Sequence, residues 1–236
     1  MAFRFLSGFG PRYGDPVIIR ALVFDFDGLI LETEMPSLQS WAEIYKEHGH
    51  DIPMDLWHSY IGSDRGFEPI EHLAALVGEG LDKVATQARR DQRKTELIAA
   101  LDVIEGVRDY LDEARGLGLR LAVASSSSRT WVLGHLERLG LAAYWDVVRT
   151  RDDVERTKPA PDLYLSVTSA LGVAPAEALA LEDSPNGIAA AKSAGLRCVA
   201  VPNALTASMD LSAADLRLES LAKTSLDVLL AALSRD

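Results

Sequence analysis

The amino-acid sequence predicts an α/β protein, with a parallel sheet and an inserted all-helical segment. Residues 17–24 form an apolar run broken only by Arg20, which is typical of a strand buried on both faces. From Ile104 onward, short apolar runs alternate with segments of helical periodicity, the pattern of a Rossmann-like core. Between these parts, residues 36–101 show helical periodicity and charged faces but no β-branched run.

The alternating region predicts its elements in chain order. Apolar runs predict strands at residues 119–124, 145–149, 178–181, 198–201 and 216–218. Helical periodicity predicts helices at residues 107–116, 129–139, 161–171, 185–194 and 226–233. Several of these helices are followed by a glycine, as at Gly140, Gly172 and Gly195, and glycine commonly ends a helix.

The chain therefore divides into three parts. Residues 1–16 are rich in glycine and aromatic residues and are expected to form an arm outside the fold. Residues 17–35 and 102–236 are expected to form the α/β core, and residues 36–101 the helical insert. A chain of 236 residues with 48% apolar residues can bury a sizeable core.

Composition argues against several partners. With 24 basic and 35 acidic residues, the net charge of −11 makes nucleic acid an unexpected ligand. No apolar run approaches the roughly 18 residues of a membrane span, and the N-terminal residues lack the apolar region of a secretory signal. Cys198 is the single cysteine, so an internal disulfide is impossible. We expect a cytoplasmic protein, either a monomer or a small homo-oligomer.

Polar side chains follow four of the expected strands. The first strand ends in Asp25 and Asp27, and the second in four serines that begin at Ser125. The third is followed, after a loop, by Lys158, and the fourth ends in the pair Glu182-Asp183. The carboxyl ends of parallel strands meet at one edge of a sheet, where ligands bind, so these groups should share one crevice.

Carboxylates gathered at one edge require neutralisation, because like charges at short range repel one another. Oxygen ligands without His or Cys suit Mg²⁺, which we expect as the cofactor. Taken singly, each group has an ordinary structural interpretation: a turn, a solvated loop, or a helix start with its capping side chain. Their common position at the strand ends favours a functional site.

These residues resemble the haloacid dehalogenase-like hydrolase superfamily, specifically its β-phosphoglucomutase-like branch with a helical cap. The resemblance covers residues 17–235 and rests on four motifs. They are Asp25-Phe26-Asp27-Gly28-Leu29-Ile30, Leu119-Arg120-Leu121-Ala122-Val123-Ala124-Ser125, Lys158-Pro159-Ala160-Pro161 and Leu181-Glu182-Asp183-Ser184-Pro185-Asn186-Gly187. The helical insert lies where that branch carries its cap.

The resemblance implies a mechanism for phosphate-ester hydrolysis. It makes Asp25 the nucleophile that forms an aspartyl-phosphate, and Asp27 the acid that protonates the leaving group and then activates water. Mg²⁺ would be held by Asp25, by the backbone carbonyl of Asp27 and by Asp183, with Glu182 either a direct ligand or next to one.

The same resemblance implies which residues bind the phosphoryl group and which bind the rest of the substrate. Ser125, Ser126 and the following N–H groups would bind the phosphoryl oxygens at a helix start, and Lys158 would balance the charge of the transferring group. The cap would select a small phosphorylated metabolite, such as a sugar phosphate. In the cap loop 61–66, Arg65 is expected to contact a second anionic or hydroxylated group.

Single residues distinguish a phosphatase from the alternative activities. β-Phosphoglucomutases carry a His just after the nucleophile loop, where this chain has Ser37, so a phosphatase is favoured over a mutase. Haloacid dehalogenases lack the second aspartate, which is present here as Asp27. Phosphonatases need a cap lysine, but Lys46, Lys83 and Lys94 are expected to be exposed on helices. A non-catalytic regulator on this fold is a further alternative, although all four motifs are retained.

Overall fold

The computed structural model describes residues 18–61 and 67–234. The predicted arm (1–16) and Arg65 therefore lie outside the described residues. Within them, six parallel strands form one sheet in the order β3-β2-β1-β4-β5-β6. The strands are β1 (Ala21–Phe24), β2 (Arg120–Ala124), β3 (Val147–Arg149), β4 (Ala178–Glu182), β5 (Arg197–Ala200) and β6 (Leu216–Arg217). The predicted α/β fold class is confirmed.

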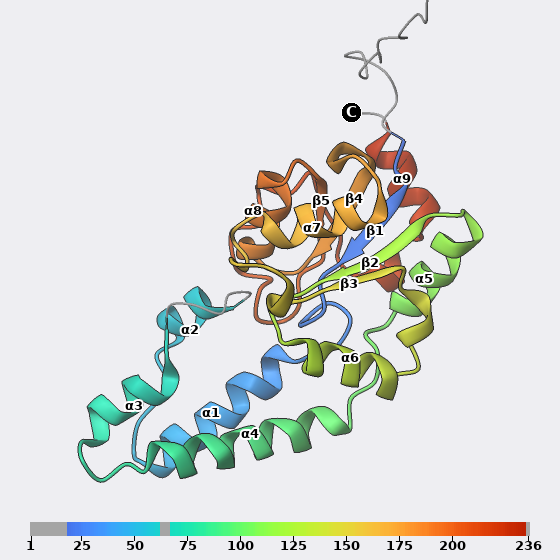
Figure 1. The fold of residues 1–236 in the computed structure, drawn as a ribbon. Helices are drawn as coiled ribbons and strands as arrows, with labels where there is room; N and C mark the ends of the chain where they lie inside the picture. The colour runs from blue at the N-terminus through green and yellow to red at the C-terminus, as the bar shows by residue number, and fades with distance from the viewer. Residues whose placement is uncertain (1–17, 62–66, 235–236) are drawn as a thin grey trace, which may run out of the picture.

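Some helices cover the two faces of the sheet, and the others form a separate group below it in Figure 1. They are α1 (Glu34–Glu47), α2 (Met54–Tyr60), α3 (Pro69–Val77), α4 (Lys83–Ala99), α5 (Val107–Gly116), α6 (Arg129–Arg138), α7 (Asp162–Leu171), α8 (Pro185–Ser193) and α9 (Leu226–Leu233). Helices α5, α6 and α9 pack on one face, and α7 and α8 on the other. The group formed by α1 to α4 is the helical insert that the sequence predicts.

Side-chain alternation along the strands explains the two faces. In β1, Leu22 and Phe24 belong to the core under α5, α6 and α9, whereas Ala21 and Val23 face α7 and α8. The second face is lined largely by alanines of β2, β4 and β5, which allows its two helices to approach the sheet closely. Both faces of β1 are buried, as its apolar sequence predicts.

The helical insert has a hydrophobic core of its own. Trp41 and Tyr45 of α1, Trp57 of α2 and Leu73 of α3 are among its buried members. The Tyr45 hydroxyl donates a hydrogen bond of 2.8 Å to the carbonyl of Pro69, which joins α1 to the start of α3. The insert is therefore a packed unit rather than a set of loose surface helices.

The first strand and the first helix of the insert begin at other residues than the sequence predicts. The first strand begins at Ala21 rather than at residue 17, because the neighbouring strands β2 and β4 begin opposite Ala21. Helix α1 begins at Glu34, two residues before the segment in which the sequence shows helical periodicity. Its free N–H groups are satisfied by the Glu32 carboxylate, which accepts hydrogen bonds from the N–H of Glu34 at 2.9 Å and of Met35 at 3.1 Å.

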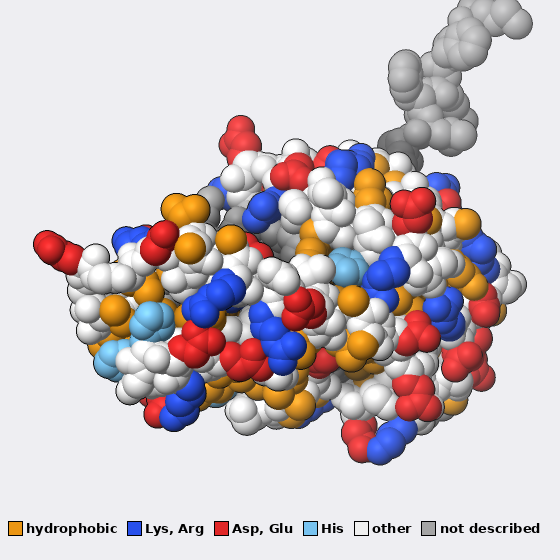
Figure 2. Space-filling view, turned by 90° about the horizontal axis from the view of Figure 1, so that it is seen from below, with side chains coloured by type: hydrophobic (Ala, Val, Ile, Leu, Met, Phe, Trp, Pro, Cys, Tyr) orange, Lys and Arg blue, Asp and Glu red, His pale blue; other side chains and the backbone are white. Residues whose placement is uncertain are grey.

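The two connections between core and insert lie side by side. Leu31 forms an antiparallel bridge with Val103, and the Ile104 N–H donates to the carbonyl of Ile30 at 3.0 Å. On the surface in Figure 2, acidic and basic side chains are interspersed. Within residues 18–61 and 67–234, no helix combines the length and the apolar character needed to cross a membrane.

Candidate active site

The carboxyl ends of the central strands bring the predicted site residues together. The register places Phe24 of β1 opposite Val123 of β2 and Leu181 of β4. Asp25 follows Phe24 directly and Glu182 ends β4, so both carboxylates lie at the same edge of the sheet. A cleft of about 600 Å³ opens there, lined by residues of this edge and of α1 and α4.

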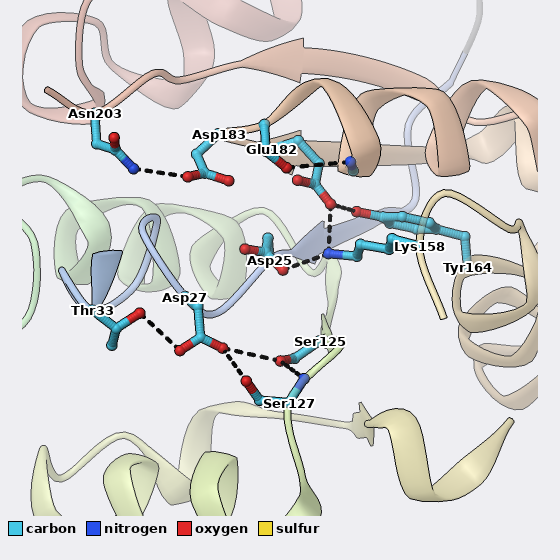
Figure 3. Close-up of polar contacts among 12 residues, drawn as sticks. Asp25, Asp27, Thr33, Ser125, Ser127, Lys158, Tyr164, Glu182, Asp183 and Asn203 are labelled. Atoms are coloured by element: carbon cyan, nitrogen blue, oxygen red, sulfur yellow. Dashed lines mark hydrogen bonds and ion pairs between the residues drawn. The ribbon is translucent and has the colours of Figure 1, made fainter. Parts of the chain in front are cut away.

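Three buried carboxylates form an acidic cluster at this edge, namely those of Asp25, Glu182 and Asp183 (Figure 3). Each offers an oxygen atom within 4.8 Å of the others. Lys158 is 2% exposed, and its ammonium forms ion pairs with Asp25 and, at 2.6 Å, with Glu182 Oε1. The Tyr164 hydroxyl donates to the same oxygen of Glu182. The Lys158 ammonium therefore balances only part of the charge of the acidic cluster.

Burial and mutual repulsion perturb the ionisation of these groups. Burial raises the pKa of Asp25 from 3.8 to about 8; Lys158 opposes this rise, and Glu182 adds to it. Burial likewise raises the pKa of Asp183 well above its ordinary value. For Lys158, burial lowers the pKa, but the charges of Asp25 and Glu182 outweigh it and raise the net value. A bound cation would stabilise the ionised carboxylates and so lower the pKa values of Asp25 and Asp183.

The acidic cluster fits a hard divalent cation. Glu182 Oε2 is buried and has no hydrogen-bond partner within the described part of the chain. Asn203 Nδ2 donates to Asp183 Oδ2 at 2.8 Å and so orients that carboxylate. The donor set consists of carboxylate oxygens without His or Cys, which is the set that such ions prefer.

Asp27 lies in the same cleft but outside the acidic cluster, and its carboxylate is surrounded by donors (Figure 3). Oδ1 accepts hydrogen bonds from Thr33 Oγ1 at 2.8 Å and from Trp131 Nε1 at 2.9 Å. Oδ2 accepts from Ser127 Oγ at 2.6 Å and from Ser125 Oγ at 3.4 Å. The two aspartates of the first motif therefore have different surroundings.

The serine run leads from the end of β2 to the start of α6, the helix that the sequence predicts from residue 129. Helix α6 begins at Arg129, and the Ser128 hydroxyl caps its first turn. Ser125 is fully buried, and its hydroxyl accepts a hydrogen bond of 3.0 Å from the N–H of Ser127, which ties the loop together. Ser126 lines the cleft, and its buried hydroxyl has no partner among the residues that the structure describes.

Two glycines allow the backbone to approach the acidic cluster. Gly28 has a φ of +83°, and a Cβ atom there would lie 2.4 Å from Asp183 Oδ2. A Cβ atom at Gly187 would lie 1.8 Å from Glu182 Oε2. Both distances are far below van der Waals contact, so these carboxylates can occupy their positions only beside glycine.

Gly187→Ala is expected to displace the Glu182 carboxylate and to destabilise the fold by about 2 kcal/mol, as overpacking of a buried site does. Chemical denaturation measures this change. The matched control is Gly134→Ala, in the exposed middle of α6 with nothing within 4 Å of the added methyl group. The control should be neutral or stabilising, because alanine favours helix. Equal stability of the two variants would contradict the close packing at Gly187.

The cleft wall formed by α1 and α4 carries charges of both signs, among them Glu34 and Arg90. Burial raises the pKa of Glu34 to about 7, and the charge of Asp27 adds to the rise. Arg90 is 8% exposed; its Nη2 donates to Ser37 Oγ at 2.6 Å, and its guanidinium lies 5.2 Å from the centre of the Trp41 ring. Ser37, the residue at the mutase histidine position, is thus buried and engaged by Arg90.

Lys94 corrects one expectation from the sequence. It is half-buried and lines the cleft, and its Nζ lies 4.5 Å from the centre of the Trp131 ring. The electron-rich face of an indole attracts an ammonium group, which accounts for this inward position. Lys46 and Lys83 are exposed, as expected, with 66% and 47% of their side-chain surface accessible.

Several residues of the site are not predicted from the sequence, namely Thr33, Glu34, Arg90, Trp131 and Asn203. A signal existed for Asn203, because it follows β5 at the same edge at which Asp25 follows β1. Thr33 and Glu34 also follow the first motif closely. No comparable signal marks Arg90 or Trp131, because their directions depend on how α4 and α6 pack.

The core is a parallel α/β sheet, with acidic residues at its strand ends and a lysine beside them. This arrangement defines a hydrolase whose reacting groups are carboxylates. The family model for haloacid dehalogenase-like hydrolases matches residues 22–201, and the chain belongs to this family. The predicted resemblance and the hydrolase class are confirmed.

Individual relatives match most of the chain. YhcW of Bacillus subtilis is 45% identical over 213 residues, which are 90% of this chain and 97% of YhcW. Validoxylamine A 7'-phosphate phosphatase of Streptomyces hygroscopicus subsp. limoneus is 31% identical over 180 residues, which are 76% of this chain and 84% of that protein. The crystal structure of CbbY from Rhodobacter sphaeroides in complex with phosphate has a TM-score of 0.71 at 30% identity, covering 87% of this chain and 96% of CbbY. These similarities support assignment to the phosphoric monoester hydrolases.

Proposed function

We propose that this protein is a Mg²⁺-dependent phosphatase that hydrolyses a small phosphorylated metabolite through an aspartyl-phosphate intermediate. The observation that carries the proposal is a pair of aspartates held in different ways at one sheet edge. Asp25 belongs to the acidic cluster beside Lys158, whereas Asp27 is held by hydroxyl and indole donors. One carboxylate can then attack phosphorus while the other transfers the proton.

In the first half-reaction, Asp25 attacks phosphorus and the bond to the leaving oxygen breaks. Lys158 keeps positive charge beside Asp25 and the transferring group. The Ser126 hydroxyl, which has no partner among the described residues, offers a donor to the phosphoryl oxygens, and the hydrogen bond from the Ser127 N–H to Ser125 Oγ holds the loop in place. Positioning and electrostatic stabilisation of this kind account for most of catalysis in phosphoryl transfer.

Asp27 carries the proton through both half-reactions. It protonates the leaving alkoxide in the first, and is left as a carboxylate. It then removes a proton from the water molecule that attacks the aspartyl-phosphate, which restores both aspartates. The hydrogen bonds from Thr33 and Ser127 keep the Asp27 carboxylate within the cleft during this exchange.

Asp25, Asp183 and the backbone carbonyl of Asp27 would hold the Mg²⁺, with Glu182 either a direct ligand or next to one. The buried, unpartnered Oε2 of Glu182 supports this assignment. When bound, the ion supplies positive charge for the phosphoryl oxygens and for the ionised acidic cluster.

The helical insert (36–101) is proposed to act as a cap over the core (17–35 and 102–236), and the cleft to take a sugar phosphate or a similar metabolite. The cleft volume of about 600 Å³ is in the range of small-molecule sites. Glu34, Arg90 and Lys94 offer partners for hydroxyl and anionic groups of the substrate. The name of one relative, validoxylamine A 7'-phosphate phosphatase, supports a phosphorylated metabolite as the substrate.

A mutase is less favoured, because Ser37 and not histidine stands beside the cleft and is engaged by Arg90. The test is a phosphate-release assay over a panel of sugar phosphates, with Asp25→Asn as the blank. A hexose 1-phosphate distinguishes the two activities, since a phosphatase releases inorganic phosphate and a mutase yields an isomerised sugar phosphate. A phosphonoaldehyde belongs in the panel because Lys94 lines the cleft.

Removal of divalent cations is expected to abolish this activity. Without a cation the raised pKa of Asp25 favours its protonated form, which is a poor nucleophile, and Lys158 alone is left to balance the charge of the phosphoryl group. The assay is repeated after treatment with a chelator and again after Mg²⁺ is added back. Activity should fall to the level of the Asp25→Asn blank and return with Mg²⁺. Full activity in excess chelator would contradict the metal dependence.

A further inference from the structure

We infer that Trp131 is a positioning residue for proton transfer, because its indole N–H fixes the orientation of the Asp27 carboxylate. This inference rests on the proposed function, in which Asp27 exchanges the proton. Trp131 Nε1 donates to Asp27 Oδ1 at 2.9 Å, and the indole also lines the cleft. Trp131 belongs to α6, far in sequence from the loop that carries Asp27.

Contacts on several sides hold the indole in place. The Trp131 backbone N–H donates to the capping hydroxyl of Ser128 at 3.3 Å, which fixes its place in the first turn of α6. The ring of His135, one turn later, meets the indole edge to face with centroids 4.3 Å apart. The Lys94 ammonium lies 4.5 Å from the centre of the indole ring. The N–H therefore points at Asp27 from a rigid support.

The indole differs chemically from the other donors to Asp27. The hydroxyls of Thr33, Ser125 and Ser127 can either donate or accept, so they adapt to a neutral or an ionised carboxyl group. An indole N–H can only donate. It keeps Oδ1 as the acceptor oxygen, which leaves Oδ2 to carry the proton.

The proton transfers follow from this difference between Oδ1 and Oδ2 of Asp27. As Asp25 forms its bond to phosphorus, the bond between phosphorus and the ester oxygen breaks, and the leaving oxygen takes the proton of Asp27 Oδ2. Water then attacks phosphorus, gives one proton back to Asp27 Oδ2, and releases Asp25 from its acyl phosphate. The balance is one phosphate ester and one water converted into one alcohol and one inorganic phosphate.

Lys94 connects the Trp131 indole to the helical insert. It lies on α4, whereas Trp131 lies on α6 of the core, so their contact spans the cleft from one unit to the other. The contact with Lys94 holds the indole only while α4 lies close to the core. The orientation of Asp27 is thereby linked to the position of the insert.

The test compares two esters with Trp131→Phe, which keeps an aromatic ring but removes the N–H. A simple alkyl phosphate releases a poor leaving group that needs the acid, whereas p-nitrophenyl phosphate releases a stabilised phenolate that does not. kcat/KM reports only the steps up to the aspartyl-phosphate. We expect it to fall about 30-fold for the alkyl ester, which is a part of the roughly 10²- to 10⁴-fold that general acid catalysis contributes, and less than about threefold for the aryl ester.

Two controls separate the possible failures. Trp145→Phe makes the same change at an indole that packs on Phe24, outside the cleft, and should leave both esters unaffected. Asp27→Asn should show the same preference for the aryl ester as Trp131→Phe, only larger. Equal losses for both esters in Trp131→Phe, or no loss, would overturn the role of Trp131 while the phosphatase stands. A wild-type protein inactive on every ester would instead overturn the proposed function.

Discussion

Asp25→Asn is expected to abolish phosphatase turnover, with kcat reduced on the order of 10⁵-fold, the scale of nucleophile loss in covalent catalysis. The amide oxygen of asparagine is a poor nucleophile and cannot form the acyl phosphate. The substitution preserves shape and removes only the charge of a residue that lies beside Lys158 at the end of β1. The measurement is release of inorganic phosphate from the best ester of the panel, with saturating Mg²⁺.

The same variant should be at least as stable as the wild type when both are free of metal. The pKa of Asp25 is ordinarily 3.8 and is raised to about 8 in the fold, so ionisation between these pH values favours the unfolded chain. Asparagine avoids this cost and leaves Lys158 paired with Glu182. Denaturant unfolding at pH 7 in chelator measures the effect.

Asp109→Asn is the matched control for this substitution, because Asp109 is exposed on α5. It should change neither activity nor, beyond a few tenths of a kcal/mol, stability. Retention of substantial turnover by Asp25→Asn, with Asp109→Asn unchanged, would show that another residue is the nucleophile.

The acidic cluster could be predicted because it depends only on the strands being parallel. Asp25 and Glu182 follow apolar runs, and in a parallel sheet the ends of such runs meet at one edge whatever the order of the strands. Lys158 could be assigned to the same edge because it follows the third strand, but its ion pairs with Asp25 and Glu182 depend on the path of the loop beyond β3, which has no local signal.

The residues that hold Asp27 could not be predicted in the same way. Trp131 stands in an amphipathic segment where an indole is ordinarily a packing residue, and only the orientation of α6 turns its N–H to the cleft. Arg90 is one of several basic residues of α4, and nothing in the sequence marks it as the buried one. Such roles are set by tertiary packing, which local patterns do not encode.

Lys158→Met is expected to lower kcat/KM on the order of 10³-fold, because it removes a preorganised charge from the reacting group. Methionine fills the space of the buried lysine stem but leaves Asp25 and Glu182 without their ammonium partner. Loss of one partner of a buried ion pair costs about 3 kcal/mol of stability, so folding is checked by circular dichroism and denaturation. The activity loss is read from initial rates on the folded variant.

The affinity for Mg²⁺ separates an electrostatic role of Lys158 from simple damage to the site. Removal of a positive charge makes the acidic cluster more negative, so Lys158→Met should bind Mg²⁺ more tightly than the wild type while it turns over more slowly. Isothermal titration calorimetry measures the affinity. The control is Lys192→Met, which removes a half-exposed partner of Asp215 and should change neither quantity. A Lys158→Met variant in which activity and Mg²⁺ affinity fall together would mean that the lysine organises the site rather than balancing its charge.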